Sequence, residues 1–325
     1  MMRSLNKERN FIRNYSTGLA AILVFLGTIS TPTQASSDKQ ADSSNEVPVH
    51  MVVTVKPRNS GGQVPAVGPA DVKVYQRDRQ NMVTSWVPLQ GDRAGLQLFI
   101  LIDDTARASL GLQLDSIKKF IEEQPETTAI GVGYMRNGTV FTVQNLTKDH
   151  AAAAKALRLP LGGAGSASPY LSISDLMKKW PVSENRREIL MITSGIDPLG
   201  GNPFTNPYLS AAIDRAQQGG FIVYSIYTPA AGRLGRGFFR GNLGQTGLDM
   251  LGQKTGGTTY YLGVGTPVDL SPYLQDVSFS LKHQYELTFL AKSAKKPTLE
   301  PVKVKTEMPN IGVIAAEDSY VGTGM

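Results

Sequence analysis

The strongest constraint on this chain is an uninterrupted apolar segment that ends at two carboxylates. Residues Leu98 to Ile102 are all apolar, and Asp103 and Asp104 follow them directly. A continuous apolar run of strand length predicts a strand covered on both faces, as in the centre of a parallel sheet. The next segment, 106–124, carries apolar residues at the spacing of one helix face. Open α/β sheets bind ligands at the carboxyl ends of their strands, so the two aspartates mark a candidate site.

Strand and helix patterns continue to alternate after this first pair. The further predicted strands are 129–134, 140–146, 188–192, 221–227 and 258–262. The further predicted helices are 149–159, 246–254 and 269–282, with two more that begin at Pro169 and Pro207, each after a capping residue. This alternation predicts an α/β fold with a doubly wound, mostly parallel central sheet flanked by helices.

The N-terminus has the pattern of an export signal. A basic segment, 1–18, precedes an apolar core of about 11 residues, which is shorter than the roughly 20 needed to span a bilayer. Thr33-Gln34-Ala35 fits a small-x-small cleavage site. We therefore expect residues 1–35 to be a signal peptide, 36–48 a polar linker, and the protein to be exported to the periplasm or secreted. The alternative is an uncleaved signal that tethers the chain to a membrane.

The two ends of the mature chain share a β-like character. Short strands are predicted at 49–55, 71–75 and 82–87, and again at 285–291, 301–306 and 311–315. Neither end can bury a core of its own at this size. We therefore predict that 49–94 and 283–325 pair as a small β-module, with an α/β domain at 95–282 inserted between them.

Composition and motifs narrow the classes of function. The formal charge is +6, but half of it lies in residues 1–35, so the remainder gives little reason to expect a nucleic-acid partner. The chain has no cysteine, and its three histidines have no metal-like spacing. Neither a Gly-x-Ser-x-Gly elbow nor a Walker A motif occurs. We therefore expect a protein that is not an enzyme.

The order of several segments resembles the von Willebrand factor A (VWA) domain, in particular the bacterial exported group called VWFA-related. The segments that carry the resemblance are Asp71–Tyr75, Leu98–Thr105, Arg187–Gly195, Leu248–Tyr261, His283–Leu287 and Ala316–Tyr320. The resemblance implies a VWA or Rossmann-like fold and a role in protein binding or adhesion. It also implies a metal-ion-dependent adhesion site at the end of the first strand.

That metal site is degenerate in this sequence. The family pattern is Asp-x-Ser-x-Ser in the first loop, a threonine in the second and an aspartate in the third. Asp103 and Thr105 match the first loop, but Arg107 stands at the second serine and Ser194 at the third-loop aspartate. A guanidinium would repel Mg²⁺ or take its place, so an Asp103–Arg107 ion pair is the expected alternative to a metal.

Four other oxygen-bearing residues lie near these positions in the sequence. The second loop, 162–168, offers Ser166 or Ser168, and Asp104 and Asp197 could compensate for the lost ligands. We assign all four to the predicted binding surface. We expect no obligatory cofactor, with Mg²⁺ at the remodelled Asp103, Thr105 and Ser194 site as the alternative.

A loop rich in arginine and glycine follows the strand at 221–227 and should emerge beside Asp103. Over 231–245 it interleaves arginines with paired aromatics, which could grip a partner by charge and stacking. These residues are Arg233, Arg236, Phe238, Phe239 and Arg240. The alternative is a mobile surface loop whose phenylalanines fold back onto the domain.

The sequence therefore predicts an exported, non-enzymatic interaction or adhesion-type module that binds an unidentified protein partner through the carboxyl edge of its sheet. The first alternative is a Mg²⁺-dependent adhesin with a remodelled site around Asp103. The second is a binder of an anionic polymer through the arginine and glycine loop. The sequence leaves the oligomeric state open.

Overall fold

The computed structural model describes residues 45–323, apart from 60, 61, 63, 163–167, 234, 236, 262, 264 and 266. The described residues belong to one compact unit, Asp42–Met325. The predicted signal peptide and most of the predicted linker lie outside them, and strand β1 (Glu46–Pro57) already begins within the linker's last three residues. Across the part that is described, no helix combines the length and apolar character needed to cross a bilayer.

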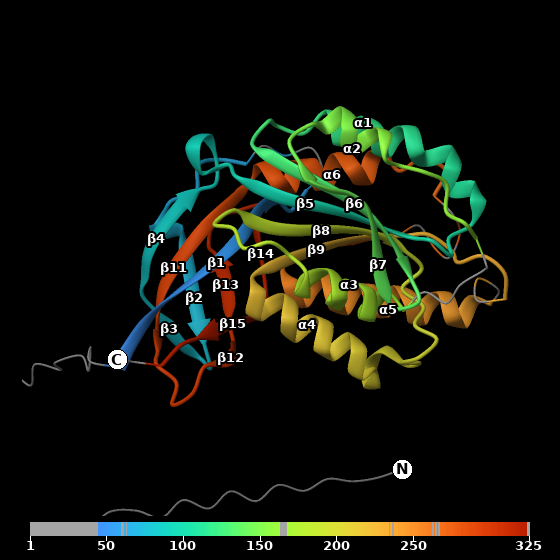
Figure 1. The fold of residues 1–325 in the computed structure, drawn as a ribbon. Helices are drawn as coiled ribbons and strands as arrows, with labels where there is room; N and C mark the ends of the chain where they lie inside the picture. The colour runs from blue at the N-terminus through green and yellow to red at the C-terminus, as the bar shows by residue number, and fades with distance from the viewer. Residues whose placement is uncertain are drawn as a thin grey trace, which may run out of the picture. The chain divides into compact units, whose positions relative to one another are not determined.

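A six-stranded sheet forms the centre of this unit (Figure 1). Its strand order is β10-β9-β8-β5-β6-β7, and every pair is parallel except β6 with β7. The strands are β5 (Leu96–Asp103), β6 (Thr128–Arg136), β7 (Thr139–Thr147), β8 (Arg186–Thr193), β9 (Phe221–Tyr227) and β10 (Thr259–Tyr260). All eight residues of β5 are buried. The predicted α/β class is confirmed.

Helices cover both faces of this sheet (Figure 1). One face carries α1 (Leu114–Glu122), α2 (His150–Lys155) and α6 (Ser271–Lys282). The other carries α3 (Pro169–Lys178), α4 (Pro207–Gly219) and α5 (Phe238–Thr255). Leu98, Ile100 and Ile102 of β5 join the first core, while Phe99 and Leu101 join the second. Burial on both faces therefore explains why residues 98–102 of this strand are all apolar.

Two helices differ from the sequence prediction. The first predicted helix is split into a 3₁₀ helix, η4 (Ala108–Gln113), and the shorter α1. Helix α5 begins at Phe238, so the second half of the predicted loop 231–245 is helical. A Cβ on Gly244 would lie 2.1 Å from the Ser194 carbonyl oxygen, so this glycine lets α5 pack directly on the loop after β8. Tertiary packing has overridden the poor helix propensity of a glycine-rich segment.

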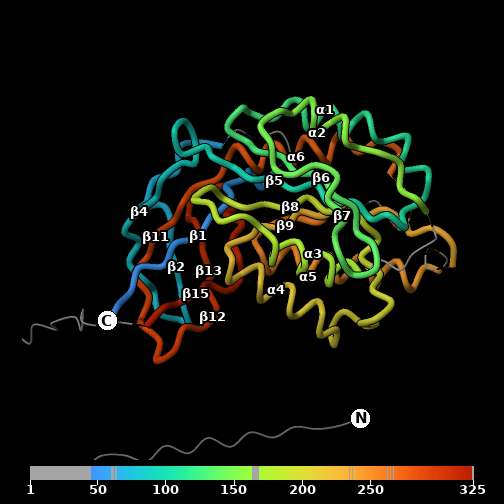
Figure 2. The backbone as a smooth tube through the Cα atoms, viewed as in Figure 1, coloured from blue at the N-terminus to red at the C-terminus, as the bar shows by residue number. Residues whose placement is uncertain are grey.

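The N- and C-terminal segments pair with each other in antiparallel sheets, side by side in Figure 2. Strand β1 lies between β11 (Gln284–Lys292) and β14 (Ile311–Ala315), and β11 also pairs with β4 (Val83–Pro88). Smaller sheets join β13 (Lys303–Thr306), β2 (Val72–Gln76) and β3 (Arg79–Asn81), and β12 (Thr298–Pro301) with β15 (Asp318–Val321). Short 3₁₀ turns are η2 (Pro69–Asp71), η3 (Gly91–Arg93) and η5 (Pro203–Thr205). The division into two domains stays a prediction.

A buried carboxylate lies close to where the terminal strands meet the central sheet. Glu188 of β8 is fully buried, and within the described residues neither of its carboxylate oxygens has a hydrogen-bond partner. Arg186, two residues earlier, donates to the Leu281 carbonyl and the Gln284 side chain. Burial raises the pKa of Glu188 to about 7, because the positive charge of Arg186 offsets only part of the desolvation.

This carboxylate makes the stability of the fold depend on pH. The pKa of Glu188 lies above its ordinary value of 4.5, so the unfolded chain releases this proton first as the pH rises. Between pH 4.5 and 7 the free energy of unfolding should therefore fall, by about 3 kcal/mol at most. We expect Glu188→Gln to flatten this dependence and to be more stable than the parent at pH 8, measured by urea unfolding. The exposed Glu184→Gln is the control, and an unchanged slope in Glu188→Gln would contradict the prediction.

Candidate functional site

Asp103 closes a buried hydrogen-bonded turn at the carboxyl end of β5. Its side chain is 1% exposed. Its Oδ1 accepts from the Thr105 amide at 2.8 Å and hydroxyl at 2.7 Å, and its Oδ2 accepts from the Thr193 hydroxyl at 2.9 Å. Burial raises the pKa of Asp103, against the opposing effect of these bonds and of the Ser194 backbone. The hydroxyls of Thr105 and Thr193, at the ends of the neighbouring strands β5 and β8, therefore satisfy the carboxylate of Asp103, the first candidate metal ligand.

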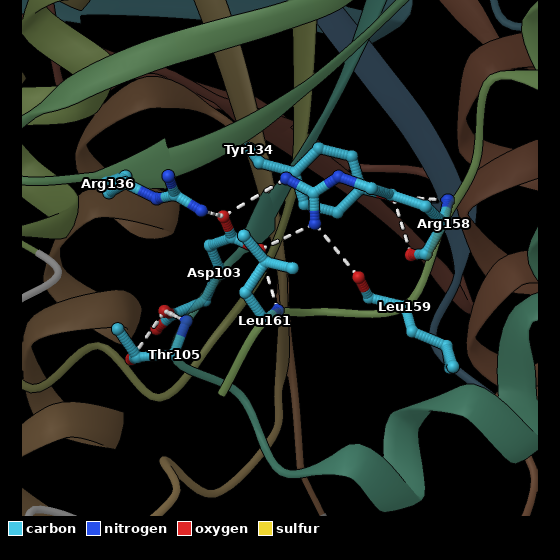
Figure 3. Close-up of polar contacts among 8 residues, drawn as sticks. Asp103, Thr105, Tyr134, Arg136, Arg158, Leu159 and Leu161 are labelled. Atoms are coloured by element: carbon cyan, nitrogen blue, oxygen red, sulfur yellow. Dashed lines mark hydrogen bonds and ion pairs between the residues drawn. The ribbon is translucent and has the colours of Figure 1, made fainter. Parts of the chain in front are cut away.

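Asp104 is held by two arginines, Arg136 and Arg158. Figure 3 labels both arginines, together with Asp103 and Thr105 of the neighbouring turn. Arg158 binds it through two nitrogens, at 2.7 and 3.1 Å, Arg136 donates at 2.8 Å, and the Leu161 amide donates at 3.0 Å. The Arg158 guanidinium also lies 3.7 Å from the Tyr134 ring centre. Burial acts to raise the pKa of Asp104, but the hydrogen bonds from Arg158 and Leu161 and the arginine charge together hold it below its ordinary value. Asp104 thus fastens the loop after α2 to the end of β5.

Arg107 does not contact Asp103, so the predicted Asp103–Arg107 ion pair is wrong. Its guanidinium donates to the carbonyl oxygens of Ala230, at 3.3 Å, and Gly235, at 3.0 Å. The Ala231 amide donates in turn to the Thr105 carbonyl at 2.8 Å. Arg107 is exposed and joins the loop after β5 to the loop after β9, which places the arginine and glycine segment beside the Asp103 turn.

Asp197 and Ser168 belong to a third hydrogen-bonded group, separate from those around Asp103 and Asp104. Its Oδ1 accepts from the Ser168 hydroxyl at 3.0 Å and the Leu199 amide at 3.1 Å, and its Oδ2 accepts from the Asn206 amide group at 3.0 Å. Ser194 is buried, and its hydroxyl accepts from the Ile196 amide at 3.4 Å. Two of the predicted surface residues, Ser166 and Arg236, lie outside the described residues.

The described side chains do not fit a hard divalent cation. Mg²⁺ requires about six oxygens in near-octahedral geometry. Asp103 supplies the one carboxylate of its group, and both of its oxygens already accept hydrogen bonds. The two guanidiniums hold Asp104. Within 45–323, gaps apart, no three Asp, Glu, His or Cys side chains are grouped to hold a metal.

A pocket of about 410 Å³ opens between the loop after β8 and the first turns of α5. Beside it, the side chains of Phe238 and Phe239 are 70% and 73% exposed, which contradicts the alternative in which they fold back onto the domain. Arg240 is exposed and donates to the Arg233 carbonyl at 3.4 Å. The residues that line this edge pocket are Tyr170, Gly195, Ile196, Asp197, Pro198, Gly201, Asn202, Pro203, Asn206, Phe239, Arg240, Leu243 and Gly244.

Sequence reasoning missed four residues that hold these groups together. Thr193 directly precedes Ser194 at the end of β8, so its position at a strand end was a usable signal. Asn206 was identified as a helix cap, and it caps α4 through its oxygen while its nitrogen binds Asp197. Arg136 and Arg158 lie 32 and 54 residues from Asp104, and no local pattern indicates that pairing.

Comparison with known proteins finds similarity only among solved structures, since neither a family model nor a curated protein matches. An aerotolerance-related membrane protein from Bacteroides fragilis is 15% identical, with a TM-score of 0.43, covering 57% of this chain and 98% of that one. The von Willebrand factor domain of the pili tip protein Mfa5 from Porphyromonas gingivalis is 10% identical, with a TM-score of 0.41, covering 57% and 94%. Other similar structures are described as von Willebrand A domains, among them those of SpRpn10 and of a Catenulispora acidiphila protein.

The likeness is distant in every case. The proximal thread matrix protein 1 of mussel byssus, solved with zinc in its adhesion motif, is 12% identical, with a TM-score of 0.42, covering 61% of this chain and 48% of that one. The fold class rests on the strand order and helices of this chain, and the zinc belongs to the mussel protein.

Removing the charge of Asp104 should loosen the edge of the sheet. Asp104→Asn leaves two guanidiniums without a carboxylate and turns one acceptor into a donor. We expect the free energy of unfolding to fall by about 2 kcal/mol and hydrogen exchange to rise at 158–162. The control is Asp115→Asn, because Asp115 is exposed and pairs only with Lys118 on α1. Equal stability of the two variants would contradict a structural role for Asp104.

Proposed function

We propose that this chain is an exported, non-enzymatic module that binds a protein partner through the loops at the carboxyl edge of its central sheet, without an obligatory metal. The observation that carries the proposal is the exposed apolar and basic surface around the edge pocket. We call this the edge surface, and its members are Leu199, Phe204, Arg233, Phe238, Phe239 and Arg240. Contiguous exposed apolar groups mark interaction sites on soluble proteins.

The state of the carboxylates supports binding without metal. Asp103, Asp104 and Asp197 each accept at least three hydrogen bonds from the protein. A partner carboxylate would therefore meet the arginines of the edge surface and not an open coordination position. The remodelled metal site around Asp103 stays the alternative, and it requires these hydrogen bonds to be exchanged for a cation.

The chemistry of the pocket supports a role without catalysis. General acid–base catalysis needs a titratable group within reach of a substrate. Of the pocket residues, Tyr170 donates to the Gly195 carbonyl at 3.1 Å, burial raises its pKa, and Asp197 is fully hydrogen-bonded. Export rests on the signal pattern in residues 1–35, with an uncleaved membrane tether as the alternative.

Metal should not stabilise the protein. A site at a metal concentration 100 times its Kd would add about 2.7 kcal/mol, which is a shift of several degrees in Tm for a chain of this size. We expect no change in Tm in millimolar MgCl₂ or MnCl₂, followed by differential scanning fluorimetry. A rise that Asp103→Ala abolishes would establish the metal-dependent alternative.

Partner binding should depend on the edge surface and not on divalent cations. The purified chain is cross-linked to the envelope of its source cell, and the recovered partner is identified and then bound in purified form. We expect Phe239→Ser with Arg240→Gln to weaken that affinity about ten-fold or more, since buried aromatic and arginine contacts dominate interfaces. EDTA should have no effect. Met82→Ser with Arg215→Gln is the control, with one exposed apolar residue and one exposed arginine from outside the edge surface.

The same binding experiment distinguishes a protein partner from an anionic polymer. Binding of a polyanion through Arg233 and Arg240 would fall steeply with salt, because it releases condensed counterions. Binding that persists at high salt, and that is lost when Phe239 is replaced, would support a protein partner.

A further inference from the structure

We propose that the edge pocket seats one apolar side chain of an acidic peptide segment, whose carboxylates lie against Arg240. This inference rests on the proposed function and narrows it to the chemistry of the partner. The pocket, the exposed apolar groups near its rim and the exposed positive charge of Arg240 each support one part of the proposal.

The pocket has the size and the preformed walls of a binding site. Its volume of about 410 Å³ lies within the range of ligand pockets, about 300–1,000 Å³. Tyr170 fixes one wall by donating to the Gly195 carbonyl, and Asp197 fixes another by holding Ser168 and Asn206. These bonds hold the walls in place before any partner arrives, so little ordering is needed on binding.

Apolar groups surround the opening. Phe239 lines the pocket, yet its side chain is 73% exposed. Leu199 and Phe204 are 62% and 72% exposed, and each adjoins a proline that lines the pocket. A leucine or phenylalanine inserted between these groups would cover apolar surface on several sides, which is the typical environment of an interface anchor.

The charge at the opening is positive. Arg240 lines the pocket and donates to the Arg233 carbonyl. Among the described residues, neither of these two arginines forms an ion pair. Asp197 also lines the pocket, but its side chain is buried and held by three donors, so Arg240 is the charged side chain that is exposed at the rim. Helix α5 begins beside Arg240 with no acidic residue in its first turn, so the helix dipole adds to the positive field. Carboxylates are therefore the complementary groups.

The two neighbouring phenylalanines distinguish a peptide from an anionic lipid surface. Phe238 and Phe239 are almost equally exposed, but only Phe239 is among the residues that line the pocket. A membrane would take up both protruding rings, whereas a peptide anchored in the pocket depends on Phe239. The concave shape favours the peptide.

A random peptide library displayed on phage, selected against the whole chain, tests the proposal without assuming a sequence. We expect enrichment of peptides with a leucine or aromatic residue flanked by Asp or Glu. In fluorescence anisotropy, an enriched peptide should bind about ten-fold or more weakly to Phe239→Ser and to Arg240→Gln. Phe238→Ser and Arg215→Gln should bind it as the parent does. Replacing the anchor with serine, or the carboxylates with amides, should abolish binding.

Three results would overturn the inference. They are the absence of acidic, apolar peptides after selection, equal loss in the Phe238 and Phe239 variants, and binding to phosphatidylglycerol vesicles that competes with the peptide. Leu243→Trp, which fills the pocket and leaves its charge unchanged, separates this inference from the proposed function. If the native partner still binds Leu243→Trp but not Phe239→Ser with Arg240→Gln, the edge surface stands and the pocket inference fails.

Discussion

The structure depends on the burial of β5 on both faces, which carries two consecutive carboxylates into the protein at its carboxyl end. Asp103 and Asp104 are 1% and 2% exposed, and burying a charge without a partner is costly. The fold meets this cost in two ways. Asp103 receives hydroxyl donors and keeps a raised pKa, while Asp104 receives two guanidiniums and has a lowered one. The pKa values of these two adjacent carboxyl groups are therefore shifted in opposite directions.

The different contacts of Asp103 and Asp104 bear on where the proposed binding surface lies. The Asp103 turn is hydrogen-bonded to the loop after β9, and Asp104 is hydrogen-bonded to the loop after α2. Both turns therefore stabilise the edge of the sheet. Exposed phenylalanine and arginine side chains lie in the loop after β9, in η5 and in the first turn of α5. A surface of this kind binds through apolar burial and charge complementarity, for which no metal is required.

The central architecture could be predicted because its signals are local, whereas the contacts of the site are not. Apolar runs identified β9 to the residue and the central five residues of β8, and the Asn206-Pro207 pair identified the start of α4. The partners of Asp104 lie too far along the chain for any periodicity to reveal them. Arg107 was placed wrongly because proximity in sequence suggested Asp103, but the carbonyl oxygens of a distant loop were better aligned.

Two glycines allow helix α5 to pack directly against the loop after β8. A Cβ on Gly195 would lie 2.3 Å from the Gly244 carbonyl, and one on Gly244 would lie 2.1 Å from the Ser194 carbonyl, so both must lack side chains for α5 to meet the loop after β8. With that contact, α5 begins at Phe238, and the second half of the predicted loop 231–245 forms one wall of the pocket. The same glycines that make the segment a poor helix former in isolation therefore place Phe239 and Arg240 at the rim of the edge pocket.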